Sequence, residues 1–207
     1  AVVASVPWYY KMAMSFQYGD KLVLNEKTQQ YEYAEIDESK QVVKYAAVRD
    51  RGTSVQILVN GDKDGEPVAL SDSVLMVFKQ YMNRVKVAGV VLGISSKESD
   101  KLAIEAKIYI DPLVLTQQGV SLSDGSKPVE IAIKDYLKNI TFGGTFNKTK
   151  LINAILAVDG VEDVELGICK YQPDGSLDWR EMSGNNYIGE SGSYIPYNIS
   201  DTLTYVV

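Results

Sequence analysis

Histidine is absent from the 207-residue sequence, and there is a single cysteine, Cys169. Without histidine, the chain cannot build Ser-His-Asp or Cys-His catalysis, and it has no imidazole ligand for a metal. One cysteine allows no intrachain disulfide, and its place in an expected strand indicates a small core residue. We therefore expect no enzymatic activity, no catalytic residue and no cofactor. An enzyme that uses carboxylates alone is the least favoured alternative.

Excess positive charge and long apolar runs are also missing. The formal net charge is −6, and the lysines are scattered rather than clustered. Nucleic-acid binding requires a basic face, so a nucleic-acid partner is not expected. No apolar run reaches the ~18–20 residues that a membrane-spanning helix needs, so membrane insertion is not expected either.

The acidic residues form no convincing metal site. Asn60, Asp62, Asp64 and Gly65 copy the first half of a calcium-binding EF-hand loop, but Ser71 stands where that loop needs a bidentate glutamate. A second acidic run follows an expected helix and is interpreted as a solvated rim, because adjacent strand residues point to opposite faces. Its members are Asp159, Glu162, Asp163 and Glu165. We expect no bound metal.

The pattern of apolar residues predicts an α+β fold. We expect a small, mostly-β N-terminal module with one leading helix over residues 1–66, followed by two helix-bearing α+β units over 67–127 and 128–207. Ser71 or Asp72 is expected to cap the second helix, and Thr145 or Asn147 the fourth. Helices are predicted over 7–18, 73–85, 128–140 and from about 148 to 158, and strands over 21–25, 31–36, 42–48, 54–60, 90–94, 102–110, 161–168, 177–182 and 202–207.

Two connections follow from this assignment. Residues 95–101 read as a polar turn between the strands at 90–94 and 102–110, and residues 183–200 read as a loop rich in Gly, Ser, Asn and Tyr. Four glycines at the ends of elements are expected to be architectural, since glycine accepts the positive φ that such corners need. They are Gly89, Gly143, Gly144 and Gly160.

Tyrosine is abundant, with fourteen in the chain. Its large apolar body and polar tip favour protein interfaces, and its ring can also stack on sugars. The candidate interface residues lie toward the two ends of the chain, and some of them could instead pack the small β module. They are Trp8, Tyr9, Tyr10, Tyr18, Tyr187, Tyr194 and Tyr197.

Residues 68–170 resemble the baseplate J-like proteins of contractile and related phage tails. In that family a helix precedes a Gly-containing strand pair, and a second helix leads to a small-residue corner, a third helix and a strand. The matching positions here are Gly89, Val90, Leu137, Phe142, Gly143, Thr149, Leu151, Ala154, Ile155, Val158, Gly160 and Val161. The family is structural and has no catalytic residues to carry over.

The resemblance implies a structural subunit of a phage tail baseplate, or of a prophage-like contractile injection apparatus. Its partners would be other tail and baseplate proteins, it would act as an oligomer in the assembly, and its location would be the virion after synthesis in the bacterial cytoplasm. The alternative is a surface or periplasmic binding module for glycans that uses the Tyr-rich loop 183–200.

Overall fold

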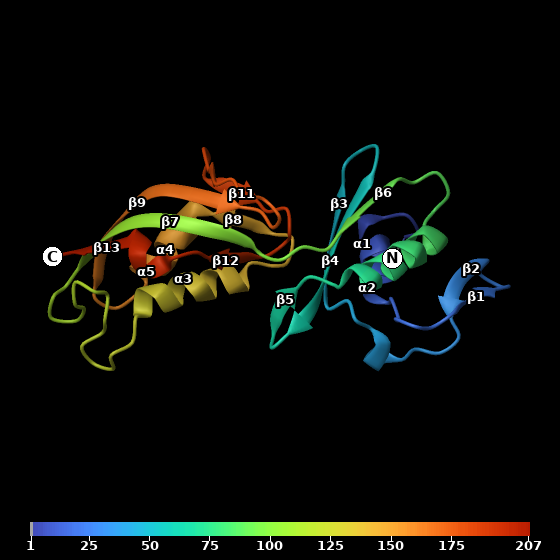
Figure 1. Cartoon of the computed structure of the whole chain (residues 1–207), viewed down its shortest axis with the longest axis horizontal. Helices are drawn as coiled ribbons and strands as arrows, with labels where there is room; N and C mark the ends of the chain where they lie inside the picture. The colour runs from blue at the N-terminus through green and yellow to red at the C-terminus, as the bar shows by residue number, and fades with distance from the viewer. Residues whose placement is uncertain (1) are drawn as a thin grey trace. The chain divides into compact units, whose positions relative to one another are not determined.

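The computed structural model describes residues 2–207, which form an α+β fold of five α-helices and 13 β-strands. The α+β prediction is confirmed. The chain divides into two compact units, one ending at Glu98 and the other running from Ser99 to Val207. Figure 1 shows the elements of both units.

The N-terminal unit combines two helices with short sheets. A hairpin of two strands, β1 and β2, stands apart from a second sheet in which β4 pairs antiparallel with β3 and β5 and parallel with β6. The elements are α1 (Val6–Met14), β1 (Leu22–Asn25), β2 (Gln30–Tyr33), the 3-10 turn η1 (Glu38–Lys40), β3 (Tyr45–Asp50), β4 (Val55–Lys63), β5 (Glu66–Val68), α2 (Asp72–Val85) and β6 (Leu92–Ser95).

Aromatic residues from both helices fill the core of this unit. Phe16, just beyond α1, lies edge-on to Phe78 of α2, with ring centroids 5.3 Å apart. Both rings are fully buried, together with Ile57 and Val59 of β4. Ser71 caps α2, because its hydroxyl oxygen accepts from the Val74 N–H. Of the two expected caps for this helix, the serine is the one used.

The division into units differs from the expected segments 1–66, 67–127 and 128–207. The strands predicted at 90–94 and 102–110 do not pair with each other. Instead β6 pairs with β4 in the N-terminal unit, while β7 pairs with β9 in the C-terminal unit. The polar residues 95–101 therefore join two sheets rather than turn a hairpin, and the boundary falls inside the segment 67–127.

The C-terminal unit is built on one five-stranded sheet in the order β10-β9-β7-β12, with β13 also paired to β7. Strands β12 and β13 both run parallel to β7, along the edge that β9 leaves free. The elements are β7 (Asp100–Ile110), α3 (Pro128–Asn139), β8 (Thr145–Asn147), α4 (Lys148–Leu156), β9 (Val161–Gln172), β10 (Arg180–Glu181), β11 (Asn186–Ile188), β12 (Tyr194–Pro196), α5 (Ile199–Thr202) and β13 (Leu203–Val206).

Strand β7 decides which face of this sheet is buried. Its residues alternate, and every second side chain enters the core with α3 and α4. The buried set is Leu102, Ile104, Ala106, Ile108 and Ile110, packed with Val129, Ile133 and Leu137 of α3 and Leu151 and Ile155 of α4. The opposite face of the strand carries Lys101, Glu105 and Lys107, which are exposed.

The segment predicted as a loop, 183–200, contains two short strands and the start of a helix. β11 pairs with β8, and β12 pairs with β7. Three-residue strands are too short to show a sequence period, and these two lie in a segment rich in Gly, Ser and Asn. Their partners lie far away in the chain, so the pairing becomes visible only in the folded structure. The hairpin of β9 with the region 177–182 and the final strand at 202–207 are both present as predicted.

The four predicted architectural glycines lie at corners. Gly89, Gly143 and Gly160 have positive φ, and a Cβ at Gly144 would come within 2.6 Å of the Thr141 carbonyl oxygen. Gly160 combines both constraints. Its φ is +84°, and an added Cβ would lie 2.7 Å from Cγ1 of Val114. Only glycine fits the turn that delivers β9 from α4.

Gly160→Ala is expected to destabilise the C-terminal unit more than Gly175→Ala. Both glycines have positive φ, but Gly175 has open space around it. Each alanine carries the left-handed backbone cost of about 1–2 kcal/mol. Gly160→Ala adds an overpacking cost of roughly 1–3 kcal/mol against Val114. Urea unfolding of both variants measures the free energy of unfolding. Equal losses in the two variants would contradict the prediction, because they would mean that the Val114 side chain moves aside with no energetic cost.

Candidate interaction surfaces

The seven aromatic candidates divide between core and surface. Trp8 and Tyr9 are 6% and 1% exposed in the core of the N-terminal unit, and Tyr194 is 4% exposed in the core of the C-terminal unit. This corrects the expectation that they present their rings to a partner. The outward-facing candidates are Tyr10, Tyr18 and Tyr197, and Tyr187 is half-buried.

A buried carboxylate, Asp100, holds the segment that was expected to be a binding loop. Its Oδ2 accepts hydrogen bonds from the Tyr187 hydroxyl and from the Glu190 N–H, each at 2.9 Å. Its own N–H donates to the Ser193 carbonyl and to the Ser191 hydroxyl oxygen. Oδ1 of Asp100 has no hydrogen-bond partner, and the residue is fully buried.

Tyr194 completes this internal network. Its hydroxyl accepts from the Gly189 N–H at 2.8 Å and donates to the Gly144 carbonyl at 2.8 Å. The Tyr187 ring stacks on Tyr171 with centroids 4.1 Å apart. Tyr187 therefore holds residues 187–194 against β7, and Tyr194 holds them against the Gly143–Gly144 corner. Their large aromatic surfaces serve the fold of this unit.

Burial raises the pKa values of two ionisable side chains in this network, Asp100 and Tyr187. Loss of solvent raises the pKa of Asp100, although the hydrogen bonds from Tyr187 and Glu190 oppose that shift. Burial first, and the neighbouring Asp100 charge second, raise the pKa of Tyr187. The tyrosine therefore remains a hydrogen-bond donor to the carboxylate at neutral pH.

An aromatic pair, the half-buried Trp179 and the exposed Tyr197, lies on the other face of the sheet. The rings of Trp179 and Tyr197 are 5.0 Å apart, and the Lys101 ammonium lies 6.0 Å from the centre of the Tyr197 ring. Ile195 next to them is 42% exposed. Trp179 was not among the sequence candidates, because its partner Tyr197 becomes a neighbour only when β12 pairs with β7.

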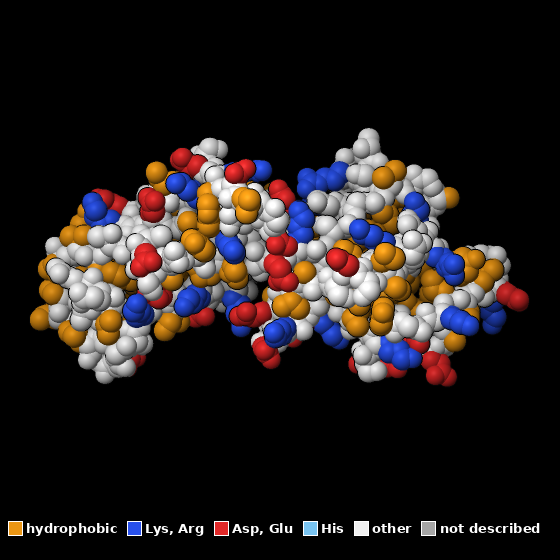
Figure 2. Space-filling view, in the orientation of Figure 1, with side chains coloured by type: hydrophobic (Ala, Val, Ile, Leu, Met, Phe, Trp, Pro, Cys, Tyr) orange, Lys and Arg blue, Asp and Glu red, His pale blue; other side chains and the backbone are white. Residues whose placement is uncertain are grey.

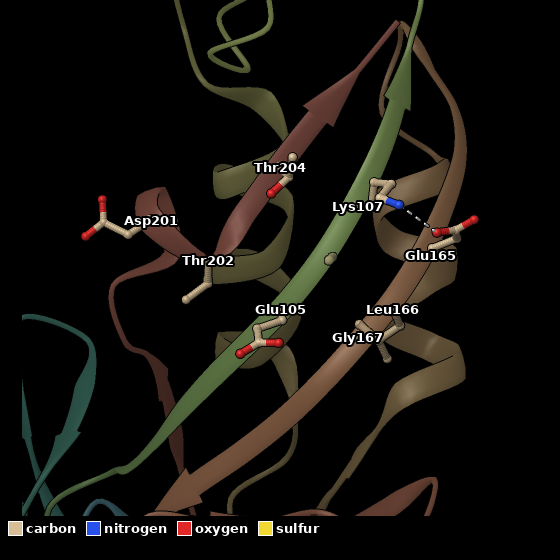
Figure 3. Close-up of a pocket in the computed structure, with 9 residues that line it drawn as sticks. Glu105, Lys107, Glu165, Leu166, Gly167, Asp201, Thr202 and Thr204 are labelled. Atoms are coloured by element: carbon tan, nitrogen blue, oxygen red, sulfur yellow. Dashed lines mark ion pairs between the residues drawn. The ribbon is translucent and has the colours of Figure 1, made fainter.

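The same open face contains a shallow, polar recess of about 520 Å³. Figure 3 shows Glu105 and Lys107 on β7, Glu165 on β9, and Thr202 and Thr204 at the C-terminal edge. Lys107 and Glu165 form an ion pair at 3.4 Å, while Asp201 points away from Glu105. Within residues 2–207, no cluster of His, Cys, Asp or Glu is arranged to hold a metal ion.

The other polar motifs have local roles. Asp62 of the EF-hand-like stretch accepts hydrogen bonds from the Tyr45 hydroxyl and the Gly65 N–H, at the turn between β4 and β5. The carboxylates of β9 are exposed, as expected of a solvated rim.

The one cysteine is not a reactive thiol. Cys169 is buried in β9, and burial raises the pKa of its thiol to about 11, which keeps it protonated and unreactive.

None of the helices within residues 2–207 has both the length and the apolar content that a bilayer span requires. Comparison of the chain with protein-family models and with curated protein sequences finds no match.

Replacing Asp100 tests whether its carboxylate anchors residues 187–194. Asp100→Ala removes the acceptor of the Tyr187 hydroxyl and of the Glu190 N–H, which are partly buried. Each lost bond should cost up to about 1–3 kcal/mol, the cost of an unsatisfied buried group. Asp100→Asn retains one acceptor oxygen and should cost less. Asp163→Ala, at an exposed position of the same sheet, serves as the control. The measurement is the free energy of unfolding in urea at pH 7.

The comparison of wild type with Asp100→Asn also has an expected pH dependence. Because burial raises the pKa of Asp100, the native state binds a proton more readily than the unfolded state. The stability of the wild type relative to Asp100→Asn should be highest below the unfolded-state pKa, about 3.9. It should fall as the pH rises through the native-state pKa and then level off. A difference that does not vary with pH would contradict this assignment.

Proposed function

We propose that the chain is a structural subunit of a phage tail baseplate, or of a prophage-like contractile injection apparatus, and acts by protein–protein assembly rather than catalysis. The order of elements from α2 to β9 supports the proposal. It runs helix, strand, strand, helix, glycine corner, helix and strand, the order on which the resemblance of residues 68–170 rests, with the three-residue strand β8 added between the corner and α4. Strands β6 and β7 belong to different sheets, so they do not form the strand pair of that family. The support therefore comes from the order of the elements and from the glycine corners.

The observation that carries the proposal is the one-sided cover of the C-terminal sheet. Helices α3 and α4 pack on one face, and the other face is open. Strand β9 pairs with β10 only at Lys170 and Tyr171, so its outer edge over residues 161–168 has no neighbouring strand among residues 2–207. An open sheet face and an unpaired strand edge are surfaces that neighbouring subunits can cover.

On this proposal the partners are other tail and baseplate proteins, and the chain works as an oligomer within the virion after synthesis in the bacterial cytoplasm. No cofactor is required. Assembly by surface burial is consistent with the two closed cores, because each unit can present a rigid surface without refolding.

A glycan-binding module is the second candidate, and the pair Trp179–Tyr197 favours it. Two neighbouring rings, 5.0 Å apart at an exposed sheet face with Lys101 beside them, offer an apolar surface on which a sugar ring can stack. Part of this site lies in the segment 183–200, where the sequence predicted a glycan-binding loop. The residue of that segment that it uses is Tyr197, rather than Tyr187 or Tyr194.

Assembly can be tested by light scattering of the full chain at several concentrations, alone and mixed with the proteins encoded beside it. Ile168→Glu, on the open face of β9, should weaken association by about tenfold or more, the size of a typical interface hot spot. Ile131→Glu is the matched control, because this isoleucine is similarly exposed but lies on α3 (44% and 48%). A monomer that binds none of these proteins would contradict the proposal.

Glycan binding can be tested by screening the full chain against an oligosaccharide array. If the second candidate is correct, Trp179→Ala should remove the signal, because stacking on the aromatic pair supplies most of the contact. Tyr10→Ala, an exposed tyrosine on α1, should leave it unchanged. No binding to any oligosaccharide, or equal binding by both variants, would reject this candidate.

A further inference from the structure

The β1–β2 hairpin of the N-terminal unit has one apolar face. Its cross-strand pairs Leu22–Tyr33 and Leu24–Tyr31 lie on that face, since side chains alternate along each strand. The opposite face carries Val23 opposite Glu32, and the Asn25 side-chain amide donates to the Glu32 carboxylate.

Only half of this apolar face is covered by the rest of the unit. Tyr33 lies parallel to Tyr81 of α2, with centroids 5.8 Å apart, and Leu22 packs against the same core. The outer pair remains open, because Leu24 is 49% and Tyr31 43% exposed. A two-stranded hairpin is marginally stable by itself. Covering its outer half would therefore stabilise it.

A recess of about 650 Å³ lies between the hairpin and α2, and we call it the hairpin groove. Phe16, Leu22, Tyr33 and Tyr81 contribute to its apolar lining, with Val77 of α2 at its side. Val77 is 41% exposed although it is apolar. In Figure 2, hydrophobic side chains gather where the hairpin approaches α2. The volume suits a few side chains rather than a globular surface.

The rim of the hairpin groove carries a surplus of positive charge. Its one carboxylate, Asp20, is neutralised by Lys40 at 2.6 Å and also accepts from the Gln17 side-chain amide. Lys21 and Arg84 form no ion pair with any described carboxylate. Arg84 lies 6.0 Å above the Tyr31 ring, at the open end of the hairpin. This local surplus contrasts with the net charge of −6.

We propose that the hairpin groove docks a short segment of a partner protein in which apolar side chains are flanked by aspartate or glutamate. The apolar lining would receive Leu-, Ile- or Phe-type side chains, and Lys21 and Arg84 would pair with the carboxylates. The proposal rests on the proposed assembly function and specifies how one partner is recognised.

Two stretches of this chain combine acidic and apolar residues, and a second copy could offer either of them. Residues 161–166 form β9 and cannot leave their pairing with β7 without exposing the core of the C-terminal unit. Residues 35–38 include the 80% exposed Ile36, but the Gln17 side chain bonds the Glu35 carbonyl and the Asp37 N–H and holds this stretch on its own unit. Neither is a free segment, so the occupant is assigned to a different protein, and a second copy is an outcome of the test.

The test is a selection of a random peptide display library on the immobilised full chain. Enriched peptides are expected to combine large apolar residues with at least one Asp or Glu. Arg84→Glu and Val77→Asp should each reduce the affinity of a synthetic enriched peptide by at least tenfold, and added salt should weaken binding. Met76→Asp is the matched control, because Met76 is 65% exposed beside Val77 and does not line the groove.

Three results would overturn the inference: no enrichment, enrichment of basic or uncharged peptides, or unchanged binding to Arg84→Glu. Arg84 is exposed, so this variant is expected to fold even if Val77→Asp does not. Concentration-dependent self-association that is lost in Val77→Asp would assign the groove to a second copy instead. If the chain assembles with tail proteins but enriches no peptide, the groove proposal is rejected and the assembly role stands. If it enriches acidic, apolar peptides but binds no tail protein, the baseplate role is rejected and the groove proposal stands.

Discussion

The alternation of side chains along β7 is the constraint on which the C-terminal unit depends. Five apolar residues of this strand face α3 and α4, and the residues between them face outward. β9 covers one edge of β7 by antiparallel pairing, and β12 and β13 share the other edge in parallel. A shift of one residue in this register would turn the whole apolar set toward solvent. The inner core and the open outer face are thus two consequences of one strand.

The network around Asp100 extends this constraint to the chain's last segment. Residues 187–194 have few apolar side chains to bury, so their position depends on hydrogen bonds to a carboxylate at the first residue of β7. Charge-assisted hydrogen bonds offset part of the cost of burying that carboxylate, and the remaining cost raises its pKa. As a result β12 begins at a defined point, and the ring of Tyr197 comes to lie beside Trp179 on the open face.

The N-terminal unit presents a different kind of surface. Its aromatic core is closed around Phe16, Phe78 and Tyr81, while the hairpin extends one apolar face beyond that core. The proposed roles of the two units are compatible, because one offers an open sheet face and the other a groove with a positive rim. Neither surface needs a titrating side chain, a metal ion or a nucleophile, which agrees with a chain that contains no histidine.

The sequence by itself determined the local structure and the class of chemistry. Apolar periodicity predicted the helices at α2, α3 and α4 and the long strands β7 and β9, because each of these elements buries a face with a regular period. The serine and asparagine caps were also recognisable, since capping is a local hydrogen bond: Ser71 and Asn147 accept from N–H groups three residues on.

Only the tertiary structure decided which strands became partners and which tyrosines remained exposed. β6 and β7 are close in sequence but belong to different sheets, and the three-residue strands β11 and β12 are stabilised by partners far away in the chain. A tyrosine suits both a core and a surface. The burial of Tyr9 and Tyr194 and the exposure of Tyr197 therefore depended on long-range packing, which no local pattern encodes.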